Sequence, residues 1–274
     1  MSDLLASHGL RPSRALGQNF VADPNTVRRI ARLAAVGRGD RVIEIGAGLG
    51  SLTLALAETG ADVTAVETDR HLLPILRDVL EDTAVTVVHA DAMHLDWGGL
   101  LGSDPGWVMV ANLPYNIATP LVADILDSVP QVSRMLVMVQ REVGERLAAQ
   151  PGDEGYGAVS VKVAYWASAS IAGRVPASVF IPRPNVESVL VRIERRQAPA
   201  VDPAAVPPGR LFQLVRAGFA QRRKMLRGSL AGLVEAGAFE AAGISPQSRA
   251  EELGVEDWGR LAAASAPVPG GAGG

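Results

Sequence analysis

The chain has 274 residues, of which 48% are apolar, so it is long enough and apolar enough to bury a sizeable core. It contains no cysteine, which excludes a disulfide framework and thiolate metal or redox chemistry and fits a reducing compartment. The net charge of −3 argues at first against a nucleic-acid partner, and without a signal peptide or a membrane-length apolar run we expect a cytoplasmic protein with no membrane contact.

The first two thirds of the chain alternate between short apolar runs and helix-length segments. The expected strands are RVIEI, ADVTAVE, VTVVHAD, WVMVANL, RMLVMVQ and SVLVRI, which begin at residues 41, 61, 85, 107, 134 and 188. Helices are expected before and between them, and the first, ahead of RVIEI, has Asp23 as its N-cap and Pro24 at its first position. This alternation predicts a doubly wound, mostly parallel α/β sheet.

The rest of the chain is less regular. Residues 155–166 fit a strand by their β-branched content and a helix by their spacing. The Pro- and Ala-rich stretch 197–209 is interpreted as a linker, and residues 210–262 as a small helical domain. We therefore predict a first domain over residues 1–196 and a disordered tail over residues 263–274.

The sequence VIEIGAGLG, residues 42–50, ends a predicted strand with a glycine loop. A dinucleotide site favours G-x-G-x-x-G, whereas this loop has Gly46, Gly48 and Gly50, preceded by Glu44. The carboxylate of Glu44 would repel a pyrophosphate but attract the cationic groups of S-adenosylmethionine. The loop therefore favours S-adenosylmethionine over NAD, although turn chemistry alone also explains Gly48.

Acidic residues end the next two predicted strands. Glu67 is positioned to accept hydrogen bonds from both ribose hydroxyls, and Asp91 from the adenine amino group, with Ala92 supplying a backbone N–H. Taken singly, Glu67 and Asp91 are explained equally well as helix caps. In this order, at the strand ends where open α/β sheets bind ligands, they favour a cofactor site.

The tetrapeptide Asn112-Leu113-Pro114-Tyr115 follows the fourth predicted strand. The side-chain carbonyl of Asn112 and the backbone carbonyl of Leu113, held by Pro114, would accept both hydrogens of an adenine amino group. Two acceptors would localise the nitrogen lone pair toward the methyl donor, and Tyr115 would stack on the base. For the tetrapeptide alone, a strand end with a turn and a buried tyrosine is the competing interpretation.

These motifs resemble those of the ribosomal RNA adenine N6,N6-dimethyltransferases, specifically the small-subunit (KsgA/RsmA) type. The matching stretches are LGQNFVAD (16–23), VIEIGAGLGSLT (42–53), VETD (66–69), HADAM (89–93), NLPYNIATP (112–120), VQREVGERL (139–147), VFIPRPNVESVLVRI (179–193) and FAQRRKMLRGSL (219–230). The resemblance implies a Rossmann-like, S-adenosylmethionine-dependent methyltransferase sheet with a small α-helical C-terminal domain. S-adenosylmethionine is thus the expected cofactor, and no metal is expected.

The resemblance also implies that an N-terminal segment, residues 10–23, closes over the cofactor, with Gln18 in support. The family's cofactor contacts fall on Asn19, the backbone of Val21, Gly46, Glu67, Asp91 and Asn112. Many relatives have leucine in place of Val21 and proline in place of Ala47. Neither departure changes the expected chemistry.

Two further sets of residues receive roles from the resemblance. Phe180 would lie near the target base, opposite the tyrosine of the tetrapeptide, although a packed loop phenylalanine is an equally good interpretation. Arg222, Arg223 and Lys224 would contact RNA phosphates from the C-terminal domain. Residues 180–230 hold ten basic and three acidic residues, a net +7 that leaves −10 for the remainder, which fits a polyanion-facing patch or a solvated basic face.

The substrate that the resemblance implies is a pair of adjacent adenosines in the 3′-terminal hairpin loop of 16S rRNA, each of which receives two methyl groups. We therefore expect an rRNA dimethyltransferase that acts on the small ribosomal subunit and has a role in ribosome biogenesis. RNA loops suit this chemistry because their bases are easily unstacked. Nothing in the sequence demands an oligomer, so a monomer is expected.

Three alternatives stay open. An Erm-type 23S rRNA adenine methyltransferase tends to have N-I-P-[FY] and in some lineages a basic tail, whereas this chain has NLPY and a tail of Gly, Pro and Ala. A non-catalytic ribosome assembly or transcription factor on the same fold would not need Glu67, Asp91 and Asn112. An NAD-dependent oxidoreductase would bind nicotinamide.

Overall fold

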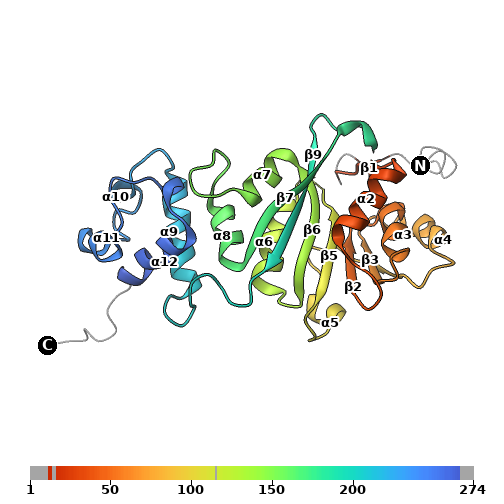
Figure 1. The fold of residues 1–274 in the computed structure, drawn as a ribbon, viewed down its shortest axis with the longest axis horizontal. Coiled ribbons are helices and arrows are strands. Elements are labelled where there is room, and N and C mark those ends of the chain that lie inside the picture. Colours follow the sequence, from red (N-terminus) through yellow and green to blue (C-terminus); the bar gives the residue numbers. More distant parts are fainter. Residues whose placement is uncertain (1–11, 14–16, 115, 266–274) are drawn as a thin grey trace. The chain divides into compact units, whose positions relative to one another are not determined.

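The computed structural model describes residues 12–13, 17–114 and 116–265 of the chain (Figure 1). The chain forms two compact units, Met1–Glu145 with Ala169–Arg195, and Arg146–Ser168 with Arg196–Gly274. Within the described residues, no helix combines the length and the apolar character that crossing a membrane requires.

The first unit is built on a seven-stranded sheet with the order β4-β3-β2-β5-β6-β9-β7. Five strands are parallel: β4 (Thr86–His89), β3 (Asp62–Glu67), β2 (Arg41–Ile45), β5 (Trp107–Asn112) and β6 (Val132–Gln140). β9 (Ser188–Arg195) runs antiparallel to β6, and β7 (Ala167–Val175) completes that edge. The predicted doubly wound, mostly parallel α/β sheet is confirmed.

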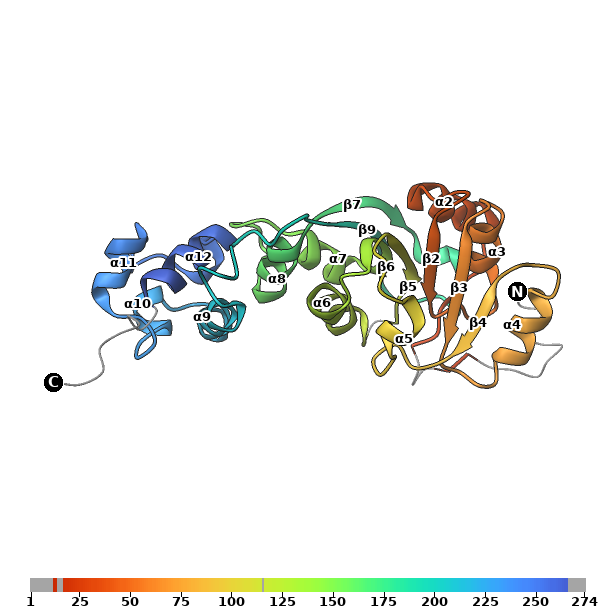
Figure 2. The same cartoon turned by 90° about the horizontal axis from the view of Figure 1, so that it is seen from below.

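Helices cover both faces of this sheet (Figure 2). α2 (Pro24–Ala34) and α3 (Ser51–Ala57) lie on one face, and α6 (Ala118–Ser128) lies on the other. The central strands are therefore apolar on both sides, and Val42, Ile43, Met109 and Val110 are fully buried or nearly so. Three further helices among the described residues are α4 (Leu73–Val79), α5 (Trp97–Leu101) and α7 (Arg141–Ala148).

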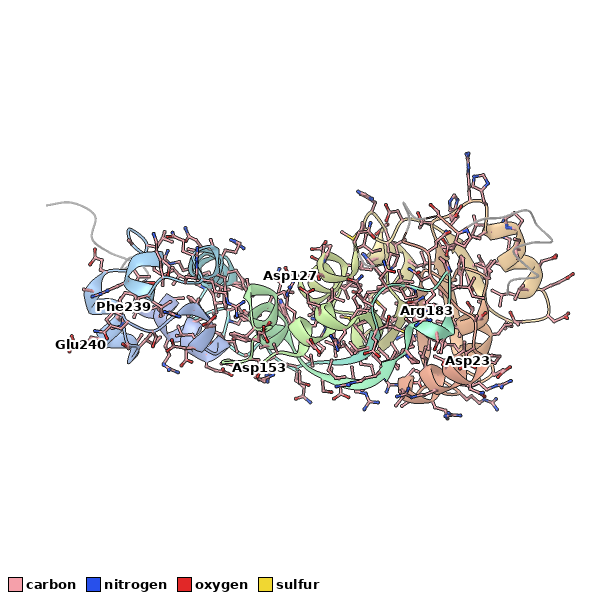
Figure 3. All side chains as sticks on the ribbon, turned by 90° about the horizontal axis from the view of Figure 1, so that it is seen from above. Asp23, Asp127, Asp153, Arg183, Phe239 and Glu240 are labelled. Atoms are coloured by element: carbon pink, nitrogen blue, oxygen red, sulfur yellow. The ribbon has the colours of Figure 1, made fainter. Side chains whose placement is uncertain are left out.

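The start of α2 has the chemistry that the sequence predicts. The Asp23 carboxylate accepts hydrogen bonds from the backbone N–H of Thr26 at 2.8 Å and of Asn25 at 3.4 Å, and Pro24 occupies the first helical position. The Thr26 hydroxyl, which donates to the same carboxylate at 2.6 Å, holds the pKa of Asp23 below its ordinary value, and the backbone bonds add to this effect. Asp23 thus fixes the point at which the N-terminal segment turns into the helix (Figure 3).

Several elements differ from the sequence-based expectation. The GQNF segment forms a two-residue strand, β1 (Phe20–Val21), which pairs antiparallel with β8 (Phe180–Ile181). A 3₁₀ turn, Ala177–Val179, precedes β8. The ambiguous residues 155–166 form a helix, α8 (Ala158–Trp166), and β7 follows it directly.

The second unit is helical. Its elements are α8, α9 (Pro208–Ala220), α10 (Leu226–Ser229), α11 (Ala236–Ala242), the 3₁₀ turn Ala250–Glu252 and α12 (Val255–Ala264). Its core holds Tyr156, Tyr165, Leu211 and Trp258, each at most 1% exposed. Residues 146–168, which the sequence assigned to the first domain, thus contribute two core tyrosines to this unit.

The linker and the tail also differ in part from expectation. Within the predicted linker 197–209, the N–H of Ala200 donates to the Tyr165 carbonyl at 2.8 Å and Val206 is buried, so this stretch packs on the helical unit. α12 extends to Ala264, two residues into the predicted tail. Residues 266–274 lie outside the described residues.

Arg195, the last residue of β9, ties this strand to the end of α6. Its guanidinium donates to the carbonyls of Val132, Leu126 and Ile125 at 2.8–2.9 Å and of Val129 at 3.1 Å. A planar fork of five N–H groups suits such a set of acceptors, and a cation at a helix C-terminus is also favoured by the helix dipole.

We predict that Arg195→Lys lowers the free energy of unfolding by about 1–3 kcal/mol, because an ammonium cannot serve four carbonyls at once. Urea unfolding measures the change. Arg38→Lys, at an exposed position, is the matched control and should leave stability within about 0.5 kcal/mol of the parent. Equal stability of the two variants would contradict the role given to the guanidinium.

Candidate functional site

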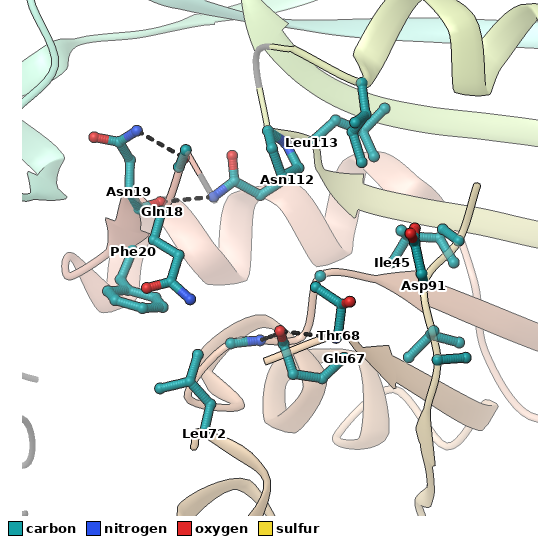
Figure 4. A pocket seen from close by; sticks show the side chains of 18 residues that line it. Gln18, Asn19, Phe20, Ile45, Glu67, Thr68, Leu72, Asp91, Asn112 and Leu113 are labelled. Atoms are coloured by element: carbon teal, nitrogen blue, oxygen red, sulfur yellow. Dashed lines mark hydrogen bonds between the residues drawn. The ribbon is translucent and has the colours of Figure 1, made fainter. Parts of the chain in front are cut away.

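A cleft lies at the carboxyl ends of β2, β3 and β5, where the strand order reverses and open α/β sheets bind ligands (Figure 4). Ten residues singled out from the sequence line it: Gln18, Asn19, Gly46, Gly48, Glu67, Asp91, Ala92, Asn112, Leu113 and Pro114. The structure therefore brings together most of the predicted cofactor and base contacts. Its described lining residues include two carboxylates and no basic side chain.

Glu67, at the end of β3, is held in place by three backbone N–H groups. Its Oε2 accepts from Gly48 at 2.7 Å, and its Oε1 accepts from Thr68 at 2.9 Å and Asp69 at 2.8 Å. The residue is 5% exposed, and burial raises its pKa while these hydrogen bonds oppose the shift. The carboxylate is thus fixed at the cleft, with lone pairs left for hydroxyl donors.

The glycine loop requires glycine at Gly48 for two reasons. Its φ is +59°, in the left-handed region, and a Cβ there would lie 3.0 Å from the Phe20 ring. The N–H groups of Gly46 and Ala47 donate to the Val66 carbonyl at 2.9 and 3.2 Å, which ties the loop to β3. The loop thereby brings the Gly48 N–H to Glu67 and leaves room for Phe20.

Asp91 lies after β4 at the mouth of the cleft. Its Oδ1 accepts from the Met93 N–H at 2.9 Å, and its Oδ2 lies 2.9 Å from His94 Nδ1. The Met93 hydrogen bond, followed by the His94 interaction, lowers the pKa of Asp91. The carboxylate is therefore ionised at neutral pH and can accept from an amino group.

Asn112 ends β5 and faces the N-terminal segment. Its Nδ2 donates to the Asn19 backbone carbonyl at 2.8 Å, as the dashed line in Figure 4 shows. Because a carbonyl can only accept, the amide must present its NH₂ group there, and Oδ1 lies on the other side. The Leu113 carbonyl has no donor among the described residues, so both predicted acceptors are available. Tyr115 lies outside the described residues.

Three residues lie elsewhere than the sequence led us to expect. Val21 and Glu44 line a smaller cavity beside the glycine loop rather than the main cleft. Phe180 lines neither cavity; it is 3% exposed and belongs to the apolar core beneath α2. Its predicted place against the target base stays a prediction, and this position gives it no support.

Glu44 is the most unusual acid of the site. It is 1% exposed and its Oε2 has no hydrogen-bond partner among the described residues, while the Thr53 side chain on α3 acts to lower its pKa. Burial, aided by the charge of Glu67, raises the pKa of Glu44 to about 8. The carboxyl is therefore largely protonated at pH 7 and becomes a charged group only at higher pH or beside a cation.

The predicted RNA-binding residues belong to the second unit, in the turn between α9 and α10. The Arg222 guanidinium donates to Glu251 Oε2 at 2.6 Å and to the Glu154 carbonyl at 2.8 Å, so it is already engaged. Arg223 and Lys224 are exposed and form no ion pair with the described residues. Of the three predicted RNA contacts, Arg222 is therefore the one that already has an acidic partner among the described residues.

Some residues of the cleft had no role assigned from sequence. Phe20 covers the glycine loop, and Leu72 and Thr68 line the wall below it. Asp69 receives a hydrogen bond from Gln18 Nε2 at 2.8 Å. The quoted stretches GQNF and VETD contain Phe20, Thr68 and Asp69, but only the folded chain shows what each one contacts.

Comparison with known proteins identifies the family. The family model described as ribosomal RNA adenine dimethylase matches residues 10–266. The chain belongs to the ribosomal RNA adenine dimethylase family. It is 48% identical over 271 residues to the ribosomal RNA small subunit methyltransferase A of Cutibacterium acnes, covering 94% of this chain and 90% of that protein. The protein of the same name from Streptomyces coelicolor is also 48% identical, over 95% and 93% of the two chains.

Solved structures agree on the fold. A dimethyladenosine transferase from Plasmodium falciparum matches 88% of this chain and 95% of its own with a TM-score of 0.75 at 22% identity. The 23S rRNA methyltransferase ErmE matches 90% of this chain and 99% of its own with a TM-score of 0.68 at 26% identity. The Rossmann-like fold is confirmed, and by family the chain is a ribosomal RNA adenine dimethyltransferase.

The buried acid gives a testable pH dependence. The pKa of Glu44 is raised from 4.5 to about 8 on folding, so the native state holds the extra proton between these pH values and stability falls as pH rises through that window. Glu44→Gln removes this loss. It should exceed the parent in stability by up to a few kcal/mol at pH 8.5, since each pKa unit corresponds to about 1.4 kcal/mol, and by much less near pH 5.

Urea unfolding of the cofactor-free protein at pH 5 and 8.5 measures the difference. Glu240→Gln on α11 is the control, because Glu240 is exposed beside the buried Phe239 (Figure 3). A Glu44→Gln variant that follows the parent at both pH values would contradict the raised pKa.

Proposed function

We propose that the chain transfers methyl groups from S-adenosylmethionine to N6 of two adjacent adenosines in the 3′-terminal hairpin loop of 16S rRNA, within the small ribosomal subunit. The observation that carries this proposal is a pair of acceptors, Asn112 Oδ1 and the Leu113 carbonyl, that have no donor among the described residues and lie in the cleft that also holds Glu67. The curated relatives carry the name ribosomal RNA small subunit methyltransferase A, which supports the choice of subunit.

The residues of the cleft fit S-adenosylmethionine, which supplies an electrophilic methyl group on a cationic sulfur. The fixed carboxylate of Glu67 suits a ribose diol, and Asp91 with the backbone of Ala92 suits an adenine edge. The described lining has no basic side chain to neutralise a pyrophosphate, which argues against a dinucleotide. Glu44, buried behind the glycine loop, becomes more favourable as an anion when a cation is near.

The tetrapeptide acts on the target amine. In the first transfer to each adenosine, Asn112 Oδ1 and the Leu113 carbonyl accept the two hydrogens of this amine and hold the nitrogen so that its lone pair points toward the methyl donor. Positive charge develops on this nitrogen during transfer, and both acceptors would stabilise it. A general base is not required, because the alkylated amine is strongly acidic and loses its proton readily.

The Erm-type alternative is less well supported. ErmE resembles the chain in fold at 26% identity, whereas the small-subunit relatives are up to 48% identical over nearly the whole chain. The non-catalytic alternative would leave the ordered contacts of Glu67 and Asn112 without a purpose. A ribosomal substrate fits a cytoplasmic protein, and a monomer suffices for the site as described.

In this proposal, the turn after α9 in the helical unit contacts the RNA. Arg223 and Lys224 project from the turn after α9 and are free of ion pairs within the described residues, which suits phosphate binding. Arg222 would have to exchange its bond to Glu251 for a phosphate, so its net contribution is smaller.

Asn112→Ala tests the proposed chemistry. It removes one acceptor and one hydrogen bond at a half-buried position, so we expect kcat to fall by about 100-fold or more while stability changes by about 1 kcal/mol. Labelled S-adenosylmethionine and unmethylated small subunits give the rate, with Asn25→Ala on α2 as the control. If the parent protein leaves the RNA unlabelled, the non-catalytic alternative is favoured; if Asn112→Ala retains full activity, the acceptor argument fails.

A second experiment concerns the RNA contact. Arg223→Ala and Lys224→Ala should each weaken binding to small subunits and reduce the slope of log K against log salt by about 0.7–0.9. Arg260→Ala is the control, because its guanidinium is paired with Asp257 in the same unit. Slopes that stay unchanged in both variants would remove this turn from the RNA interface.

A further inference from the structure

Residues 17–21 lie against the cleft through contacts with three separate parts of the first unit. β1 pairs with β8, which places Phe20 opposite Ile181. The ring of Phe20 covers the glycine loop at Gly48 and is buried in an apolar cluster with Leu72. These apolar contacts hold the end of the segment, while residues 17–19 depend on polar contacts.

Gln18 supplies the first of these polar contacts. Its Nε2 donates to Asp69 Oδ2 at 2.8 Å, and its Oε1 accepts from the Ser13 N–H at 2.7 Å. Asp69 in turn donates its own N–H to Glu67 Oε1 at 2.8 Å. Gln18 thus ties the segment to the turn that carries the ribose-binding carboxylate.

Asn19 supplies the second contact. Its carbonyl accepts from Asn112 Nδ2 at 2.8 Å, and its own side-chain NH₂ donates to the Gly17 carbonyl at 3.0 Å. The Asn112 amide has two nearly equivalent orientations about χ2 in the absence of a partner. The Asn19 carbonyl distinguishes them, because only one orientation gives it a donor.

We propose that Gln18 and Asp69 form a positioning pair that holds the Asn19 carbonyl in place and thereby orients the Asn112 amide with Oδ1 toward the target amine. The inference rests on the proposed function and adds to it. Gln18 touches no reacting atom; it acts through the backbone of Asn19. Without the pair, the reversed amide would present NH₂ to an amino group, and two donors cannot bond to each other.

An exchange of the two polar groups tests the pair. Gln18→Glu places a carboxylate against Asp69 and breaks the contact, while it can still accept from Ser13. Adding Asp69→Asn restores the contact in the opposite direction, with the new amide NH₂ at position 69 donating to the new carboxylate at position 18. The new amide oxygen can still accept from the His71 N–H. We expect Gln18→Glu to lower kcat by about tenfold and the double variant to recover to within about threefold of the parent.

Two further readouts distinguish positioning from a general structural effect. In an Asn112→Ala background, Gln18→Glu should cause no additional loss of kcat, because the group it orients is gone. The side-chain NH₂ resonances of Asn112 in the cofactor-free protein should shift in Gln18→Glu and return in the double variant. Gln247→Glu, at an exposed position of the second unit, should change neither quantity.

The outcomes separate this inference from the proposed function. An unaltered kcat in Gln18→Glu, a loss that Asp69→Asn does not rescue, or full additivity with Asn112→Ala would overturn the positioning pair while leaving the methyltransferase proposal intact. Side-chain NH₂ resonances of Asn112 that do not shift in Gln18→Glu would also overturn the positioning pair. RNA that the parent protein leaves unmethylated would instead overturn the proposed function, and with it the inference, whatever the resonances show.

Discussion

The hydrogen bond of 2.8 Å from the Asn112 amide to the Asn19 carbonyl joins the two parts of the site. One part is the edge of the sheet, which supplies carboxylates and a strand-end amide. The other is residues 17–21, of which Gly17 to Phe20 line the cleft and which are tied to the sheet unit by Gln18 and Phe20. Because the Asn19 carbonyl can only accept, the Asn112 amide must turn its NH₂ group toward it. This fixes the side on which the amide oxygen Oδ1 lies.

The fold explains why these groups meet. Parallel strands end at the same edge, and the reversal of strand order between β2 and β5 opens a crevice between their loops. Glycine at position 48 lets the loop donate to Glu67 and still leave space for Phe20. Because its pKa is raised, the buried acid Glu44 lowers the free energy of unfolding at alkaline pH. Such a destabilising buried acid is typical of a functional site rather than of a core.

Much of the fold could be predicted from the sequence, because strands such as RVIEI and the cap at Asp23 are determined by local chemistry. The β1–β8 pair could not, since two-residue strands about 160 positions apart leave no periodic pattern. Residues 155–166 were ambiguous because their apolar residues fit both a strand and a helix. The helix that forms there, α8, buries Tyr165 in the core of the second unit, a contact that the local sequence does not reveal.

The candidate site likewise contains residues that could be predicted from the sequence and contacts that could not. Glu67, Asp91 and Asn112 were singled out because they lie at the ends of successive predicted strands in an order that suits a cofactor site, and all three line the cleft; their contacts with a cofactor stay predictions. Glu67 is fixed by the backbone N–H groups of Gly48 and Asp69, and Asp69 is in turn bound by Gln18 from another part of the chain. No motif spacing encodes these contacts. Phe180 is buried in the apolar core, which no spacing within its motif indicates, and its place against the base stays a prediction.

The most direct test of the acceptor geometry is a crystal structure of the protein with S-adenosylhomocysteine and an RNA hairpin that carries the target adenosines. It should show the adenine N6 within about 3 Å of both Asn112 Oδ1 and the Leu113 carbonyl, with Nδ2 still on the Asn19 carbonyl. An adenine bound away from these acceptors, or an Asn112 amide that has left Asn19 while the base is in place, would contradict the claim.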